Sequence, residues 1–215
     1  MQSRKDGADT RRRLLEAACK IFGEKGYRDA TNADICALAE ANIAAINYHF
    51  GSKADLYRAA WVHGAECADE LYPLDGGIGP DSSAQQKLSA LIKALISRRT
   101  DRERLAQFHR IRQTEMVNPT ELLGEVMAQH LEKTHKYSAS IISDLLGPKA
   151  SQKDIELCES SVVSQCFMPR IKGMKIGPPP LHDRGADSLD ELAEHITAFS
   201  IAGLKAIRKQ IESRN

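Results

Sequence analysis

The chain has 215 residues, 42% of them hydrophobic, which is enough for one or two domains with a buried core. Its formal net charge of +1 argues neither for nor against nucleic acid, so only a local cluster of charge is informative. Aromatic residues make up 5%, and Leu, Ile and Ala dominate, so the composition favours helices over a β-sandwich.

The cysteines and the N-terminus indicate a soluble, cytoplasmic protein. There are five cysteines, an odd number, and no pair has the CxxC spacing of a zinc site or redox motif. Cys19, Cys158 and Cys166 lie among apolar residues at helical spacing, as buried small hydrophobes do. The N-terminal residues have no apolar stretch typical of a signal peptide, and no apolar run approaches the ~20 residues that span a bilayer.

Helical periodicity predicts four helices in the first 71 residues. The first covers about 10–25 and ends at Gly26, and a capping box from Thr31 to Asp34 opens the second, with Ile35, Leu38 and Ala39 as its buried face. Asn42 is a good N-cap for a short third helix that ends at Gly51. A second capping box, from Ser52 to Asp55, opens the fourth helix.

The rest of the chain also reads as helical. A loop rich in Gly and Pro, YPLDGGIGPDSS, follows the fourth helix. Five further helices are predicted over about 83–99, 102–117, 119–146, 151–168 and 187–213, with a long connector over 171–185. We therefore predict an all-α fold of about nine helices: an N-terminal three-helix helix-turn-helix domain and a larger helical domain for ligand binding and dimerisation.

The short third helix has the chemistry of a DNA-reading helix. Small residues, Ala44 and Ala45, let its backbone come close to a major groove, and Asn47 has the donor and acceptor that read a base edge, adenine best. Tyr48 and His49 can reach phosphates or bases, and Lys53 points its charge toward a phosphate backbone. A basic tail precedes them: Arg4, Lys5, Arg11, Arg12 and Arg13. The alternative is that this segment does not bind DNA. It would then be a capped short helix packed between other helices, and the basic tail would only be solvated.

The stretch ATNADICALAEANIAAINYHFGSKADLY, residues 30–57, resembles the DNA-binding domain of the TetR family of bacterial transcriptional regulators. Thr31, Ile35, Phe50, Lys53 and Leu56 hold positions of that family's helix-turn-helix pattern. The likeness runs from about Arg11 to Tyr57. The wording NIAAINYHFGSK, and the later stretches RQTEMVNPTELL and SQCFMPRI, are similar to a subgroup whose members resemble the cefoperazone- and chloramphenicol-sensitivity regulator of enterobacteria.

Three positions depart from the family's pattern. Glu40 stands where the family usually has the glycine of the turn, and a left-handed Glu costs about 1 kcal/mol. Ala44 replaces a second glycine, and Asn47 stands where the family often has tyrosine.

The resemblance implies a dimeric, ligand-responsive repressor with a DNA-binding domain over residues 1–52 and a regulatory, dimerising domain over 53–215. Its expected partner is double-stranded DNA, with a near-palindromic operator sequence. The implied DNA contacts are Thr31, Asn42, Ala44, Ala45, Asn47, Tyr48, His49 and Lys53. No metal or cofactor is expected, and the effector is a small molecule of unknown identity.

The last two helices are the expected homodimer interface. Their spaced residues are Ile155, Cys158, Val162 and Cys166, and then Leu189, Leu192, Ile196, Phe199 and Gly203. Small residues beside the second set permit close helix approach, and two such helices from each chain make a four-helix contact. The alternative is that both stripes pack inside one chain.

Candidates for the effector pocket are His63, Cys67, Phe108, Arg112, Met116, Met127, Gln165 and Phe167, with Glu115 and His130 beside them. Gln165 is the polar residue of most interest, because a buried amide needs a partner. The pair Arg112 and Glu115, three residues apart, is more often a surface salt bridge than a ligand clamp. Met and Phe would suit an amphipathic or aromatic ligand.

Two other classes of protein remain as alternatives. An enzyme is disfavoured, because the chain has no GxSxG, HExxH or Walker motif and its seven histidines are scattered. A helical protein-interaction module that has lost DNA binding is the main competitor. Salt dependence separates it from a DNA-binding protein, because phosphate contacts release counterions.

Overall fold

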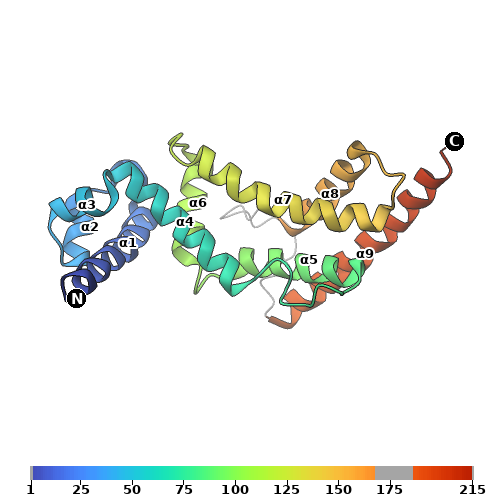
Figure 1. Cartoon of the computed structure of the whole chain (residues 1–215), viewed down its shortest axis with the longest axis horizontal. Helices are drawn as coiled ribbons and strands as arrows, with labels where there is room; N and C mark the ends of the chain where they lie inside the picture. Colours follow the sequence, from blue (N-terminus) through green and yellow to red (C-terminus); the bar gives the residue numbers. More distant parts are fainter. Residues whose placement is uncertain (1, 168–185, 215) are drawn as a thin grey trace, which may run out of the picture. The chain divides into compact units, whose positions relative to one another are not determined.

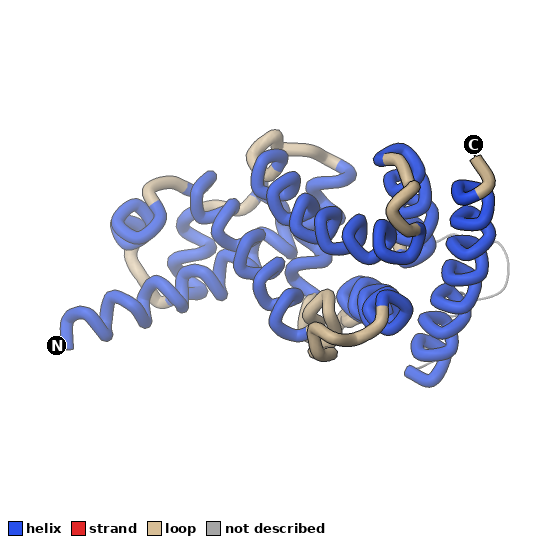
Figure 2. The backbone as a smooth tube through the Cα atoms, turned by 45° about the vertical axis from the view of Figure 1, so that its right-hand side comes forward, coloured by secondary structure: helices blue, strands red, loops and turns tan. Residues whose placement is uncertain are grey.

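In a computed structural model, residues 2–167 and 186–214 are described, with side chains for 7–167 and 189–214. These residues form nine helices and confirm the predicted all-α fold (Figures 1 and 2). The helices are α1 Gln2–Asp29, α2 Asn32–Ala39, α3 Ile43–Phe50, α4 Lys53–Leu71, α5 Ala84–Thr100, α6 Ala106–Val117, α7 Gly124–Leu146, α8 Gln152–Cys166 and α9 Ala186–Glu212. None of the described helices is both long and apolar enough to cross a membrane.

The chain packs as two compact units. Unit 1 comprises Met1–Glu70 and Asp101–His130, and unit 2 comprises Leu71–Thr100 and Leu131–Asn215. Unit 1 therefore contains α1 to α3, nearly all of α4, and α6. This division by packing differs from the functional boundary between residues 52 and 53, which stays a prediction.

Unit 1 has its own core, in which α1 meets α2, α3 and α6. Leu14, Ala18 and Phe22 form one buried stripe of α1, at the four-residue spacing of a helix face. Ile46 of α3 is fully buried as well, so the short helix has an anchor in this core. Phe22 and Tyr57 of α4 make an edge-to-face aromatic pair with ring centroids 4.8 Å apart.

α6 lies unusually close to α1. A Cβ built on Gly23 would come within 2.5 Å of Gln107 Oε1 and 3.4 Å of the Gln107 carbonyl oxygen, so glycine permits the approach. At the end of α1, Arg28 Nη1 donates to Asn118 Oδ1 at 2.6 Å, just after α6. This hydrogen bond ties the C-terminal end of α1 to the C-terminal end of α6.

Unit 2 is built around α5, which packs against α8 and α9. Its core is aliphatic and is drawn from α5, α7, α8 and α9. Its buried residues are Leu88, Leu91, Ile92, Leu95, Ile96, Ile141, Ile142, Leu146, Cys158, Val162, Cys166, Ala193, Ile196, Leu204 and Ile211. This core contains Cys158, Val162 and Cys166, three of the four spaced residues named for α8, and Ile155 packs against it.

Several predictions need correction. Leu38 is 45% exposed, because the buried face of α2 is Ile35, Cys36 and Ala39, and Leu38 lies about 100° of helix rotation from its centre. α7 begins at Gly124 instead of near residue 119, because Thr120 and the residues around it make side-chain contacts that replace a first helical turn. The predicted connector over 171–185 lies outside the described residues.

Candidate DNA-binding interface

α2 is fixed at both ends by hydrogen bonds. Asp34 N donates to Thr31 Oγ1 at 3.1 Å and Thr31 N donates to Asp34 Oδ2 at 3.1 Å, which confirms the predicted capping box. At the other end Glu40 has φ 50° and ψ 47°, the left-handed conformation that the family's glycine would adopt freely. The turn therefore keeps its geometry and Glu40 carries the strain.

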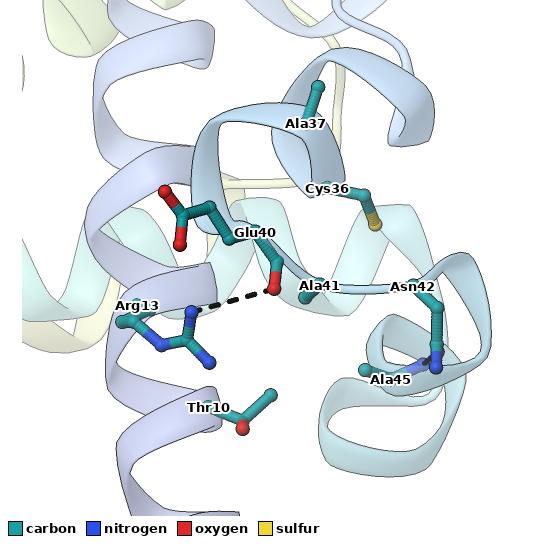
Figure 3. Close-up of a pocket in the computed structure, with 8 residues that line it drawn as sticks. All are labelled: Thr10, Arg13, Cys36, Ala37, Glu40, Ala41, Asn42 and Ala45. Carbon is teal, nitrogen blue, oxygen red and sulfur yellow. Dashed lines mark hydrogen bonds between the residues drawn. The ribbon is translucent and has the colours of Figure 1, made fainter.

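Arg13 of α1 holds this turn. Its Nη1 donates to the Ala39 carbonyl oxygen at 2.8 Å. It also approaches the Glu40 carbonyl oxygen at 3.5 Å, the contact drawn in Figure 3. A guanidinium therefore satisfies carbonyls at the end of α2. Its Nε lies 3.2 Å from Asp9 Oδ2, an ion pair within α1. Arg13, predicted as part of a tail along DNA, is a structural residue of the turn, and the sequence pattern missed this.

A cavity of about 470 Å³ lies between α1, the turn and α3 (Figure 3). It is lined by Thr10, Arg13, Cys36, Ala37, Glu40, Ala41, Asn42 and Ala45. Two of the expected DNA contacts, Asn42 and Ala45, form part of its wall. The hollow therefore opens beside the residues that would meet DNA.

α3 presents a polar, exposed face from a capped start. Asn42 Oδ1 accepts from Ala45 N at 2.9 Å, as predicted for the N-cap. Asn42, Ala44, Asn47 and Tyr48 are exposed, while Ile46 is buried on the opposite side. Tyr48 is 84% exposed, and an aromatic ring so open to water is typical of a contact surface.

The other expected phosphate contacts surround this face. Lys53 Nζ lies 4.5 Å from the centroid of the Tyr27 ring, and partial burial lowers the Lys53 pKa. The Tyr27 ring of α1 thus helps to hold the Lys53 ammonium in position. His49 packs edge-on against Tyr48 at 4.9 Å between ring centroids, and Thr31 is exposed although its hydroxyl serves the cap.

The basic residues before these helices are already engaged. Arg12 pairs with Asp9 and Glu16 at 2.7 and 2.8 Å, and the Arg11 guanidinium lies 4.9 Å from the Phe50 ring centroid. These contacts leave less free positive charge for a DNA backbone than the sequence suggests. The side chains of Arg4 and Lys5 lie outside the described residues.

Six of the eight effector candidates lie in unit 1, on α4, on α6 and at the start of α7. His63 Nε2 and Cys67 Sγ are 3.8 Å apart, and the Arg112 guanidinium lies 5.9 Å from the Phe108 ring centroid. Met127, on α7, is half-buried. Met116 also belongs to unit 1 but is 68% exposed, which argues against a pocket-lining role.

Glu115 is buried and hydrogen-bonded, so its interpretation as half of a surface salt bridge is wrong. Its Oε2 accepts from the Tyr57 hydroxyl at 3.0 Å, and its Oε1 accepts from Thr120 N at 2.8 Å. Burial, with the Glu115 carboxylate nearby, raises the pKa of Tyr57. The network joins α4, α6 and the start of the segment before α7.

Gln165 and Phe167 lie in unit 2, at the end of α8. Gln165 Nε2 donates to the Ser161 carbonyl oxygen at 3.0 Å and to Ser200 Oγ on α9 at 3.4 Å, so its amide has protein partners. The Arg99 guanidinium lies 5.8 Å from the Phe167 ring centroid. These two residues belong to a different compact unit from the other candidates.

α8 and α9 have an inward and an outward face. Cys158, Val162, Cys166 and Ile196 are buried in the core of unit 2, as the packing alternative predicts for them. Phe199 is 65% exposed, and nothing in the described structure lies within 4 Å of a Cβ built on Gly203. Leu157 of α8 is 59% exposed. The outward faces therefore hold apolar and small residues that the described part of the chain leaves open.

Comparison with known families identifies the class of protein. The family described as bacterial regulatory proteins, tetR family, matches residues 14–60. The family described as HTH-type transcriptional dual regulator CecR, C-terminal domain, matches residues 84–204. The chain belongs to the TetR family of transcriptional regulators, with a helix-turn-helix DNA-binding domain and a C-terminal domain of the CecR type.

Curated relatives agree with this assignment. The chain is 29% identical to the HTH-type transcriptional dual regulator CecR of Shigella flexneri over 181 residues, covering 77% of each chain. It is 39% identical to the HTH-type transcriptional repressor NicS of Pseudomonas putida over 69 residues, 29% of this chain and 32% of the relative.

Solved structures share the fold. A transcriptional regulator from Pseudomonas aeruginosa PAO1 superposes with a TM-score of 0.70 at 19% identity, covering 94% of this chain and 93% of that one. A TetR-family regulator from Mesorhizobium loti superposes with a TM-score of 0.62 at 22% identity, covering 94% and 97%.

Proposed function

We propose that the chain is a ligand-responsive repressor that binds a near-palindromic operator as a homodimer and leaves it when a small molecule binds. The observation that carries this proposal is the exposed polar face of α3, which is capped by Asn42 and anchored by Ile46. A helix of eight residues that buries one side chain and exposes the polar ones has its free side available for a major groove.

The residues divide into those that read bases and those that hold the backbone. Asn47 is the base-reading residue, and Ala44 and Ala45 allow α3 to approach closely. Thr31, Asn42, Tyr48, His49 and Lys53 contact phosphates, which fixes the register of the protein on DNA. Lys53 suits this role because its stacking on Tyr27 limits the conformational freedom it loses on binding.

Dimerisation supplies the second reading helix. Two recognition helices must meet half-sites about one turn apart, and a two-fold dimer presents them to a near-palindrome. The outward faces of α8 and α9, with Phe199 and Gly203, are the proposed contact. An effector that binds better to a conformation with the wrong half-site spacing lowers operator affinity by population shift.

The test is a mobility-shift titration of purified protein against DNA from beside its own gene, with non-specific competitor, at two salt concentrations. Binding to specific DNA survives competitor and weakens steeply with salt. If neighbouring DNA fails, a random-sequence selection supplies the operator. If that selection also yields nothing, the protein is an interaction module and the proposal is wrong.

Two variants test the division of roles. Asn47→Ala relaxes the sequence preference at one operator position, at a cost of about 1–3 kcal/mol on the preferred base. Lys53→Ala weakens binding to all sequences alike and lowers the salt slope by about one. An unchanged preferred sequence in Asn47→Ala would remove that residue from base reading.

A reporter gene under the operator measures the direction of regulation. Expression is expected to rise when the regulator's gene is deleted. The relative CecR is named a dual regulator, so the opposite outcome is also of interest. A fall in reporter expression on deletion would make this chain an activator at that promoter.

A further inference from the structure

Trp61 carries a polar group whose presence the packing of unit 1 does not explain. It is the only tryptophan of the chain and is 3% exposed, on α4. Its indole Nε1, fully buried, has no hydrogen-bond partner among the described residues. A buried donor without an acceptor costs free energy, which Phe at this position would avoid. An unmet donor in a regulatory helix therefore points to an acceptor that is supplied from outside.

The surroundings of Trp61 are aromatic. The Phe108 ring of α6 lies 5.6 Å away and the His130 ring of α7 lies 5.5 Å away, both edge-to-face with the indole. Phe108 is seated directly on Gly64, where an added Cβ would come within 2.9 Å of Phe108 Cβ. One flat ring thus occupies a place that only a glycine leaves open.

We propose that the Trp61 indole N–H is the donor that recognises the effector, and that the effector is a flat aromatic molecule bearing a carbonyl oxygen. This inference rests on the proposed ligand response and deepens it. The aromatic ring of the effector takes the place of Phe108, which swings away on its side-chain torsions, and the carbonyl accepts from Trp61 Nε1.

Charges of both signs lie near the cluster. The buried carboxylate of Glu115 accepts a hydrogen bond from Tyr57, one turn before Trp61 on α4. Asp69 Oδ2 lies 4.0 Å from His130 Nδ1, and the Arg112 guanidinium lies 5.9 Å from the Phe108 ring centroid. The unmet Trp61 donor, and not the sign of the surrounding charge, therefore defines the group that the effector must carry.

The position of Trp61 connects it to the DNA-binding face within unit 1. Tyr57, one turn earlier on α4, packs on Phe22 and Tyr27 of α1 with ring centroids 4.8 and 5.0 Å apart. The Lys53 ammonium in turn lies over the Tyr27 ring, in a cation–π contact. A displacement of α4 at Trp61 therefore reaches Lys53 through packed rings, and this is the route by which the effector lowers operator affinity.

The experiment uses the single tryptophan as a reporter. The full-length protein, labelled with ¹⁵N-tryptophan, gives one indole N–H resonance, which is followed while 2-acetylnaphthalene or 2-ethylnaphthalene is added. The acetyl compound is expected to move this resonance downfield and to bind about tenfold more tightly by calorimetry, because only it has an acceptor. An unmoved indole resonance, or equal affinities for the two compounds, overturns the proposal.

Two variants complete the test. Trp61→Phe keeps the ring and removes the donor, so affinity for the acetyl compound falls about tenfold while affinity for the ethyl compound is unchanged. Phe108→Leu frees space, so both compounds bind more tightly in it. A Trp61→Phe protein that still prefers the acetyl compound also overturns the proposal. If Trp61→Phe fails to fold, the indole shift in Phe108→Leu decides: no shift there overturns it.

Operator binding without any naphthalene is measured on the same preparations. Binding to DNA with no response of the indole to 2-acetylnaphthalene rejects the inference and leaves the proposed DNA function intact. A response of the indole in a protein that binds no DNA rejects the proposed function and leaves the ligand site intact.

Discussion

Glu40 is held in a conformation that favours glycine, and its side chain is exposed. Replacing it with glycine removes the left-handed strain and adds some entropy to the unfolded chain, so Glu40→Gly is expected to stabilise the protein by about 0.5–1 kcal/mol. Urea denaturation measures the difference. The same substitution at Glu24, within right-handed α1, is the control and should destabilise by about 1 kcal/mol. If both variants changed the free energy of unfolding in the same direction, the left-handed strain at Glu40 would not be the cause.

Arg13 acts on DNA through the turn that it holds. Arg13→Gln loses the bonds to the carbonyls of Ala39 and Glu40, at a cost of about 1 kcal/mol in folding free energy, and weakens DNA binding by misplacing α3. The salt slope of binding stays the same, because no phosphate contact is lost. Arg12→Gln is the matched control, since Arg12 pairs within α1. A slope reduced by about one in Arg13→Gln would make Arg13 a direct phosphate contact.

The start of α2 links its stability to pH. Lys25 Nζ lies 2.9 Å from Asp34 Oδ2, and with the Thr31 hydrogen bonds it lowers the pKa of Asp34 from 3.8 to about 2. A folded-state pKa below the unfolded value contributes stability above about pH 4 that is lost as pH falls toward 2, since the unfolded state then binds the extra proton.

Asp34→Asn should therefore flatten the acid limb of stability. Urea midpoints are measured at pH 5, 4 and 3 for both proteins. The wild type loses stability more steeply over this range, and the two proteins converge at the acid end. Parallel curves would show that the cap carboxylate is not linked to folding in this way.

Whole elements were predictable because each is marked by local chemistry. The capping boxes at Thr31 and Ser52 and the Asn42 cap place α2, α4 and α3 to within a residue. Where tertiary contacts decide, the sequence misleads. Glu115 has a partner 58 positions away in Tyr57, and the pattern of residues three apart offered Arg112 instead.

The candidate site was predictable on α3 and less so elsewhere. Exposure of Asn47 and Tyr48 beside buried Ile46 follows from the helical period of three to four residues. Trp61 was missed because an apolar residue among Leu56, Tyr57 and Ala60 reads as ordinary core. Its unmet indole N–H depends on what surrounds it in three dimensions, and a single sequence holds no record of that.

At the scale of the whole molecule, the proposed function depends on two copies of the chain. Phe199→Asp places a charge on the outward face of α9, so the dimer dissociation constant is expected to rise at least about a hundredfold. Sedimentation velocity measures this change, and affinity for a full palindrome falls toward that for a half-site. Leu131→Asp, on an equally open apolar residue of α7, is the control. A monomer in the control with a dimer in Phe199→Asp would place the interface elsewhere.

The packing of α6 on α1 has a consequence for anyone who exchanges parts between relatives. A graft that transfers only residues 1–52 would cut through unit 1 and separate Gly23 and Arg28 from Gln107 and Asn118, the partners they fit. The transplantable module is discontinuous: Met1–Glu70 together with Asp101–His130. Hybrids that move both segments keep their matched helix surfaces, and a new operator specificity then comes together with the α6 of the donor protein.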